Sequence, residues 1–226
     1  MPQKSFQTVR HWVFDLDNTL YPPSARLFDQ IERRMVAWIM RELKVDKAAA
    51  NRLRATYWTQ HGTTLAGLMA EHGIDPWNFL HDVHDIAMDH LDAAPELADL
   101  IRALPGRRIV YTNGDAFYAQ RVLEARGLGD VFDAVYGVEH ANFRPKPERV
   151  AFEAVFTKDG VAPQTAAMFE DDTRNLIEPH AMRMRTVHVA PAPTPEPHIH
   201  HHTNDLTGFL SQILDAPFPV ASTTPI

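Results

Sequence analysis

The 226-residue sequence contains no cysteine. Disulfides, cysteine-ligated zinc and a thiol nucleophile are therefore excluded. The sequence also lacks any run approaching the roughly 20 apolar residues that a membrane-spanning helix needs. Its N-terminus does not combine a basic start with a long apolar stretch, as a secretory signal peptide does. We therefore expect no membrane association and a cytoplasmic location.

An excess of positive charge is absent as well. The chain has 22 Lys and Arg against 29 Asp and Glu, which gives a formal net charge of −7 and a pI of about 6.0. This balance argues against general attraction to nucleic acid or to membrane surfaces. The hydrophobic content of 45% is ordinary for a globular protein. The length allows one sizeable domain, or a core domain with a smaller insertion.

A buried strand is predicted over residues 9–14, where apolar β-branched and aromatic residues dominate. Asp15 and Asp17 follow this run, and side chains two residues apart on an extended chain point the same way. Two carboxylates at one place are costly unless a cation or a proton intervenes. These residues alone are equally compatible with a chemical site and with an ordinary turn in which Asn18 and Thr19 bond their own backbone.

Residues 22–92 show helix signals and no strand signal. Ser24 is expected to cap the first helix, and Asp75 followed by Pro76 is typical of a helix start. Residues 61–64 interrupt the helical pattern. The expected helices cover residues 25–43, 47–60, 65–69 and 76–85. An insertion of this length, roughly 70 residues, is sufficient for a small cap domain.

From residue 95 onward, strands and helices alternate. Strands are predicted over residues 107–112, 132–137, 165–169 and 185–189, the last being the final strand. Helices are predicted over residues 96–104, 116–126, 147–156, 173–182 and 206–214. Alternation of this kind indicates a parallel sheet covered on both faces. We expect a doubly wound, Rossmann-like α/β core made of residues 1–21 and 93–226, interrupted by an all-helical cap at residues 22–92.

Residues 190–205 are rich in proline and then in histidine, and are expected to form an extended, irregular connection. His198, His200, His201 and His202 are able to bind a transition metal adventitiously. Residues 216–226 have the composition of a loose tail.

Polar side chains follow several of the predicted strands. Ligands of open α/β sheets bind outside the carboxyl ends of the strands, so these side chains are expected to converge. Each group has an ordinary alternative, namely a turn, a solvated lysine or a helix cap. Together, however, the carboxylates suit Mg²⁺ and the remaining donors suit a phosphate. The groups are Asp15 and Asp17; Thr112 and Asn113; Lys146; and Asp171 and Asp172.

The stretch Asp15-Leu16-Asp17-Asn18-Thr19 resembles the first motif (DxDxT) of the haloacid dehalogenase superfamily of phosphohydrolases. Thr112-Asn113 resembles the second motif, Lys146 the third and Glu170-Asp171-Asp172 the acidic fourth. The order, the spacing and the helical insertion after the first motif agree with this superfamily. The resemblance spans residues 9–214.

This resemblance implies an Mg²⁺-dependent phosphatase. Asp15 would attack phosphorus and form an aspartyl-phosphate, while Asp17 would act as general acid and then as general base. Mg²⁺ would be held by Asp15, the main-chain carbonyl of Asp17, Asp171 and Asp172, with Asp172 favoured as the direct ligand. Asn175 would support that loop. Thr112, Asn113 and Lys146 would bind the transferring phosphoryl group.

A narrower resemblance, to the pyrimidine 5′-nucleotidase branch, rests on residues 12–22, 62–68 and 169–176. Glu170 and Thr173 depart from its usual pattern, in which an aromatic or aliphatic residue and a serine stand at these positions. The branch implies a nucleoside monophosphate such as UMP or CMP as the substrate. Tyr21, His61, Thr63 and Thr64 are candidate nucleoside contacts, although packing at the hinge and helix capping explain them equally well.

Other functions remain open at this stage. The same core serves a sugar phosphate or another small phosphomonoester, because the core contacts only the phosphate. Carbon–halogen hydrolysis needs neither Mg²⁺ nor an acid at Asp17. A module that binds phosphate without turnover would not need every catalytic residue type.

Overall fold

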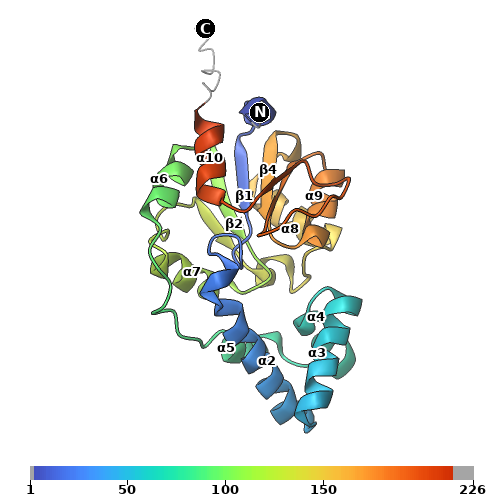
Figure 1. The fold of residues 1–226 in the computed structure, drawn as a ribbon. Coiled ribbons are helices and arrows are strands. Elements are labelled where there is room, and N and C mark those ends of the chain that lie inside the picture. Colours follow the sequence, from blue (N-terminus) through green and yellow to red (C-terminus); the bar gives the residue numbers. More distant parts are fainter. Residues whose placement is uncertain (1–2, 216–226) are drawn as a thin grey trace.

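The computed structural model describes residues 3–215. A six-stranded sheet lies at its centre, in the order β3-β2-β1-β4-β5-β6, and neighbouring strands are parallel. The first strand, β1, lies in the middle, so its carboxyl end opens at the centre of one sheet edge (Figure 1). The strands are β1 (His11–Phe14), β2 (Arg107–Tyr111), β3 (Ala134–Tyr136), β4 (Ala166–Glu170), β5 (Arg185–Val189) and β6 (His201–Thr203).

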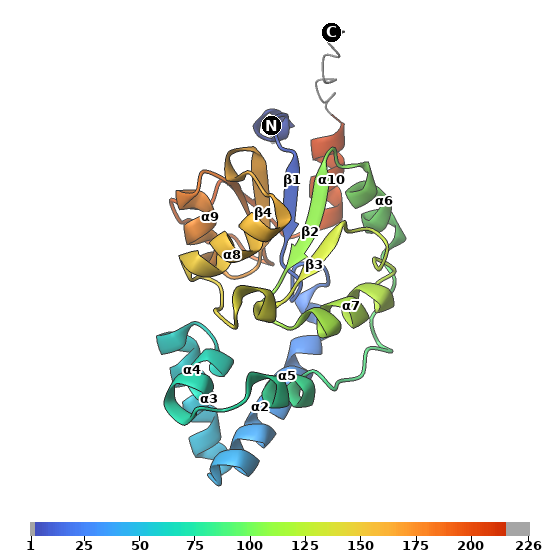
Figure 2. The ribbon, with the colours of Figure 1, turned by 180° about the vertical axis from the view of Figure 1, so that it is seen from behind.

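Helices cover both faces of this sheet (Figures 1 and 2). Trp12 and Phe14 of β1 enter one buried cluster, whereas Val13 between them enters the other. This alternation is the period of two expected of a strand buried on both faces. The doubly wound α/β core is therefore confirmed. Its helices are α1 (Gln3–Phe6), α6 (Pro95–Ala103), α7 (Ala116–Ala125), α8 (Arg149–Asp159), α9 (Ile177–Ala181) and α10 (Leu206–Leu214).

Four helices form a separate group beyond the carboxyl ends of the strands, at the bottom of Figure 1. Side-chain caps begin three of them: Asp46, Thr63 and Asp75 accept hydrogen bonds from the first-turn amides. Among the described helices, none has the length and apolar character that crossing a membrane requires. The four are α2 (Leu27–Leu43), α3 (Lys47–His61), α4 (Thr64–His72) and α5 (Pro76–Val83).

Several predicted boundaries were wrong. Ser24 does not cap α2: it lies in a 3₁₀ turn at Pro23–Ala25, and the left-handed residue Arg26 (φ 52°) separates that turn from the helix. The helix expected at residues 173–182 is a 3₁₀ turn (Thr173–Leu176) followed by α9. The predicted helix at residues 147–156 lies two residues later, at Arg149–Asp159, and α1 was not predicted.

The histidine-rich connection is more ordered than the composition indicates, and β5 is not the last strand. His201–Thr203 form the edge strand β6, which pairs with β5. A three-residue polar edge strand has no apolar run to reveal it. The neighbouring histidines hydrogen-bond locally: His198 donates to the Thr173 carbonyl and His202 to the Ala190 carbonyl. The tail at residues 216–226 lies outside the described residues.

Candidate active site

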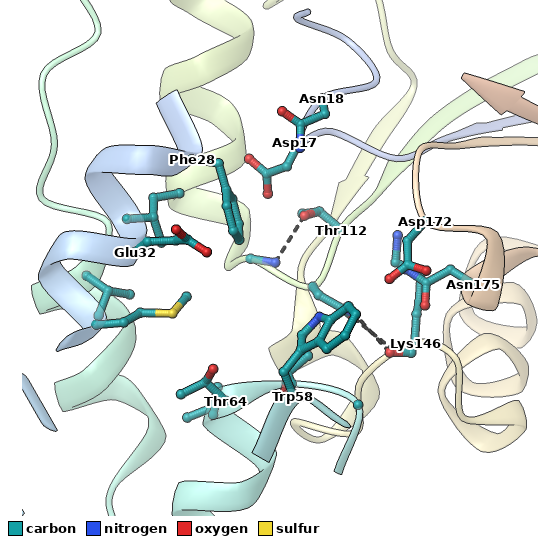
Figure 3. Close-up of a pocket in the computed structure, with 18 of the residues that line it drawn as sticks. Asp17, Asn18, Phe28, Glu32, Trp58, Thr64, Thr112, Lys146, Asp172 and Asn175 are labelled. Carbon is teal, nitrogen blue, oxygen red and sulfur yellow. Dashed lines mark hydrogen bonds between the residues drawn. The ribbon is translucent and has the colours of Figure 1, made fainter. Parts of the chain in front are cut away.

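A cavity of about 470 Å³ lies between the carboxyl ends of the strands and the helices α2–α5 (Figure 3). Its core end is lined by the polar residues that follow β1, β2 and β4, and by Lys146. Its other end is lined by side chains of α2, α3, α4 and α5. The strand-end groups predicted from the sequence therefore do meet at one site.

Lys146 is the charged centre of the core end. Its Nζ donates to Asp15 Oδ1 at 2.7 Å, to Glu170 Oε2 at 2.6 Å and to the Tyr111 carbonyl at 3.0 Å. The lysine is only 1% exposed, so water does not screen these contacts. Burial alone would lower the pKa of its ammonium group, but the adjacent Asp15 and Glu170 carboxylates raise that pKa overall.

Asp15, Glu170 and Asp171 form a cluster in which one oxygen of each lies within 4.8 Å of the others. Burial, together with repulsion from neighbouring carboxylates, raises the pKa of Asp15 to about 8 and that of Glu170 to about 8. Burial and the charge of Asp15 raise the pKa of Asp171 to about 7. These carboxylates share a single ammonium group, so a cation would relieve their repulsion.

This donor set fits a hard divalent cation such as Mg²⁺, which prefers carboxylate oxygens. Asn175 supplies a further observation: its Oδ1 is buried, lies in the wall of the cavity and has no hydrogen-bond partner among the described residues. A buried amide oxygen without a partner is costly, and a metal-bound water would satisfy it.

The two adjacent aspartates of the fourth motif have different surroundings. Asp171 lies beside Asp15 and accepts a hydrogen bond from Asn18 Nδ2 at 3.1 Å. Asp172 instead pairs with Arg174, whose Nη2 lies 2.6 Å from Asp172 Oδ2. The geometry therefore brings Asp171, rather than the Asp172 favoured by the motif resemblance, into the carboxylate cluster.

Asp17 is held by two tyrosines. The hydroxyls of Tyr21 and Tyr118 each donate to Asp17 Oδ1 at 2.6 Å. Burial and the Asp17 charge raise the pKa of both phenols well above the ordinary value, so both remain donors. Two donors on Oδ1 fix the carboxyl group and leave Oδ2 for other partners.

Thr112 and Asn113 lie at the end of β2, within the cavity wall. The Asn113 amide exchanges two hydrogen bonds with the Lys146 backbone, donating to its carbonyl at 3.1 Å and accepting from its N–H at 2.8 Å. Asn113 therefore fixes the loop that carries the lysine. The Thr112 hydroxyl accepts a hydrogen bond from the Gly114 N–H at 3.0 Å.

The far end of the cavity is mostly apolar. Its polar feature is an ion pair between α3 and α2, in which Arg54 Nη1 lies 2.7 Å from Glu32 Oε1. Trp58 also lines the cavity, with the Arg174 guanidinium 3.6 Å from its ring centre. Figure 3 shows Phe28, Glu32 and Thr64 opposite the core residues. The apolar wall consists of Phe28, Ile31, Met35, Leu65, Phe79, Leu80 and Val83.

The candidate nucleoside contacts occupy different places. Thr63 and Thr64 line the cavity, and Thr63 also caps α4. Tyr21 is buried against Asp17, and neither it nor His61 lines this cavity. The sequence reasoning did not assign roles to several residues of the site. Tyr118, Arg54 and Glu32 belong to no motif, whereas Glu170 lies within the acidic fourth motif.

Comparisons with known proteins identify the family of this chain. The family model described as haloacid dehalogenase-like hydrolase matches residues 9–177. "Phosphate metabolism protein 8" of Saccharomyces cerevisiae is 26% identical over 194 residues, which cover 78% of this chain and 59% of that protein. The chain thus spans about three fifths of the length of this curated relative.

Solved structures share the fold. An HAD phosphatase from Thermococcus onnurineus matches with a TM-score of 0.61 and 18% identity, over 91% of this chain and 98% of that one. The putative HAD-hydrolase YfnB from Bacillus subtilis, bound to magnesium, matches with a TM-score of 0.60 and 16% identity, over 92% and 99%.

The L-2-haloacid dehalogenase of Xanthobacter autotrophicus, with chloropropionic acid covalently bound, also matches, with a TM-score of 0.51 and 18% identity over 82% of this chain and 79% of that one. Structural likeness at these identities shows the fold alone. The family match covers most of the chain and includes Asp15, Lys146 and the acidic fourth motif. This protein belongs to the haloacid dehalogenase-like hydrolases.

Proposed function

We propose that this protein is an Mg²⁺-dependent phosphomonoester hydrolase that acts through an aspartyl-phosphate on Asp15, with a pyrimidine nucleoside monophosphate as its substrate. The observation that carries the proposal is the contact of Lys146 with both Asp15 and Glu170, beside a third buried carboxylate. Such a site is built to receive a cation and an anionic group together.

Asp15 is the proposed nucleophile. Lys146 donates to its Oδ1, so Oδ2 is the oxygen free to attack phosphorus in line. Attack forms the Asp15–phosphorus bond and breaks the bond to the alcohol oxygen, and water later releases phosphate from the aspartyl group. Lys146 and Thr112 are placed to offset charge on the phosphoryl oxygens.

Asp17 is the proposed general acid and base. Its free Oδ2 donates a proton to the departing alcohol oxygen, and the same oxygen accepts a proton from the attacking water. Tyr21 and Tyr118 hold the carboxyl group during both steps. Tyr21 is thereby a positioning residue for Asp17 rather than a nucleoside contact.

The proposed cation would be held by Asp15, Asp171 and the Asp17 carbonyl, with Asp172 and Asn175 completing the shell through water. It supplies Lewis-acid stabilisation of the phosphoryl charge. Glu170, held by Lys146, completes the charge balance of this end of the cavity.

The substrate proposal rests on the cavity beyond the phosphate. We propose that residues 22–92 act as a cap domain that closes over the site. Its apolar wall and the Trp58 ring suit a planar base, and the Glu32–Arg54 pair and Thr64 suit the polar edge of that base. The size of the cavity, about 470 Å³, is within the range of small-molecule sites.

The same residues distinguish the proposed function from three others. A sugar phosphatase would need hydroxyl partners where this cavity is apolar, which favours a nucleoside. A dehalogenase would need no acid at Asp17 and no cluster of Asp15, Glu170 and Asp171. A binding module without turnover would not need Asp17 held with a free oxygen.

The test is phosphate release from a panel containing UMP, CMP, purine nucleotides, glucose 6-phosphate and glycerol phosphate, with and without Mg²⁺. We expect UMP and CMP to be the best substrates and EDTA to abolish turnover. Equal rates for UMP and glycerol phosphate would overturn the nucleotidase proposal alone. Turnover that survives both EDTA and Asp15→Asn would overturn the mechanism.

A further inference from the structure

A buried histidine–aspartate pair lies at the edge of the cavity, outside the four motifs. His84 follows α5, and Asp115 is the N-cap residue of α7. His84 Nδ1 and Asp115 Oδ2 are 2.6 Å apart, and the two side chains are 9% and 2% exposed. His84 also lines the cavity.

The hydrogen bonds of Asp115 determine which nitrogen of His84 carries the proton. Burial would raise the pKa of Asp115, but the hydrogen bonds from His84 and from the Tyr118 N–H lower it overall, so Asp115 is ionised near neutral pH. An ionised carboxylate only accepts hydrogen bonds. Asp115 Oδ1 accepts from the Tyr118 N–H, and Oδ2 accepts from His84 Nδ1–H. In the neutral imidazole, Nε2 is then a hydrogen-bond acceptor, and it has no partner among the described residues.

The imidazole lies on the leaving-group side of the site. Its ring stacks on Tyr118, with ring centroids 4.2 Å apart and planes 11° from parallel. The hydroxyl of the same tyrosine holds Asp17, the proposed acid for the departing alcohol. Tyr118 therefore contacts both His84, through its ring, and Asp17, through its hydroxyl.

The surroundings hold the imidazole in place. Arg121 donates to the His84 carbonyl at 2.9 Å and to the Ile86 carbonyl at 2.8 Å, which fixes the chain where the cap rejoins the core. A Cβ at Gly114 would lie 2.9 Å from Tyr118 Cδ1 and 3.5 Å from His84 Cε1, so only glycine leaves room for the stack. A group this constrained loses little entropy when it binds a ligand.

We propose that His84, oriented by Asp115, is a specificity-determining residue whose Nε2 accepts a hydrogen bond from a second hydroxyl of the leaving alcohol. The substrate class is a phosphomonoester of an alcohol that bears a further hydroxyl, as the pentose of a nucleotide does. This inference rests on the proposed function. If the pair only tied the cap linker to the core, no hydroxyl of the substrate would matter to it.

The kinetic test compares UMP with 2′,3′-dideoxyuridine 5′-monophosphate, which lacks both sugar hydroxyls. The His84→Phe variant keeps a ring against Tyr118 but loses the acceptor, and His81→Phe, an exposed position outside the cavity, is the matched control. We expect wild type and His81→Phe to prefer UMP by about 10-fold in kcat/KM, the effect of one hydrogen bond. We expect His84→Phe to lose that preference because its rate with UMP falls.

Equal losses on both substrates in His84→Phe, or no preference in the wild type, would overturn the inference while leaving the phosphatase intact. Absence of turnover on every phosphomonoester would instead overturn the proposed function. A second measurement is independent of turnover. Imidazole ¹⁵N NMR should show one resonance pair, absent from His84→Phe, with Nδ1 protonated and Nε2 unprotonated.

Adding uridine with inorganic phosphate should shift that Nε2 resonance, whereas dideoxyuridine with phosphate should not. In Asp115→Asn, the amide oxygen of the new side chain still caps α7. Its NH₂ group must then donate to His84 Nδ1, which moves the imidazole proton to Nε2. We therefore expect Asp115→Asn to invert the tautomer, with Nδ1 unprotonated and Nε2 protonated in the ¹⁵N spectrum. An unchanged Nε2 resonance on adding uridine and phosphate would contradict the inference.

Discussion

The two ends of the cavity differ in how their charges are held. At the core end, Lys146, Asp15 and Glu170 are at most 5% exposed and are paired within 2.7 Å. The opposite end, lined by α2, α3, α4 and α5, is called the cap end. There the Arg54 and Glu32 side chains are 25% and 41% exposed, and apolar side chains surround them. Buried charges tolerate little change, since each one left unpaired is strongly unfavourable, whereas a half-exposed pair is worth little.

This difference corresponds to a division of functions between the two ends of the cavity. The core end is suited to a phosphate, which is the same in every phosphomonoester. In the proposed function, the cap end contacts the alcohol, which differs between substrates. Changes at the core end should therefore affect all substrates alike, and changes at the cap end should affect some substrates more than others. The following variants test that division.

The largest effect is expected from Asp15→Asn. Removing the nucleophile should lower kcat for every phosphomonoester by on the order of 10³-fold or more. The measurement is phosphate release from UMP and from p-nitrophenyl phosphate, with far-UV circular dichroism to confirm folding. A substrate-dependent loss would contradict the assignment of Asp15 to the common step.

Lys146→Met should abolish activity and also destabilise the core, because Asp15 and Glu170 are left buried without a counter-charge. We expect a loss of about 3 kcal/mol in the free energy of unfolding, measured in urea. Lys158→Met, at an exposed lysine of α8, is the control and should change stability by less than about 0.5 kcal/mol. Equal stabilities of the two variants would show that the buried pairs are not structural.

Mg²⁺ should raise the melting temperature of the wild type by a few degrees, because the proposed site, which includes Asp15 and Asp171, exists only in the folded protein. Asp171→Ala should reduce that shift, and EDTA should remove activity until Mg²⁺ is restored. A matched concentration of NaCl serves as the ionic-strength control. A shift that NaCl reproduces would argue against a bound cation.

Tyr118→Phe should lower kcat by roughly 10-fold for UMP, since Asp17 loses one of its two hydroxyl partners. The loss should be smaller for p-nitrophenyl phosphate, whose leaving group needs little protonation. Tyr136→Phe, which removes a hydroxyl bonded to Asp159, is the control. Identical losses for both substrates would place the tyrosine outside the acid step.

The smallest effect is expected from Arg54→Met, which should raise KM for UMP about 5-fold and leave p-nitrophenyl phosphate nearly unchanged. Arg52→Met, at an exposed position of the same helix, controls for the lost charge. If Arg54→Met lowered kcat for every substrate, the assignment of Arg54 to the substrate-specific end of the cavity would be contradicted.

The core end could be predicted from the sequence because its side chains follow buried strands. Asp15, Thr112 and Asp171 sit where apolar runs end, and parallel strands bring such ends together. The position of Asp171, and not Asp172, in the carboxylate cluster could not be predicted, because it depends on whether Arg174 reaches the second carboxylate.

The cap end could not be predicted in the same way. Glu32 and Arg54 belong to different helices, and helical periodicity indicates a buried face but not which face meets which. His84 and Asp115 pair across 31 residues, and neither stands in a recognisable motif. The strand β6 was missed because a short polar edge leaves no hydrophobic pattern.

The most direct test of the division of functions between the two ends is a ratio: kcat/KM for UMP divided by kcat/KM for p-nitrophenyl phosphate. It should be measured in the wild type, in the core variant Thr112→Val and in the cap variant Arg54→Met. We expect Thr112→Val to lower both rates and keep the ratio within about 2-fold of the wild type, and Arg54→Met to lower the ratio about 5-fold. A ratio that changes with the core variant and not with the cap variant would contradict the division.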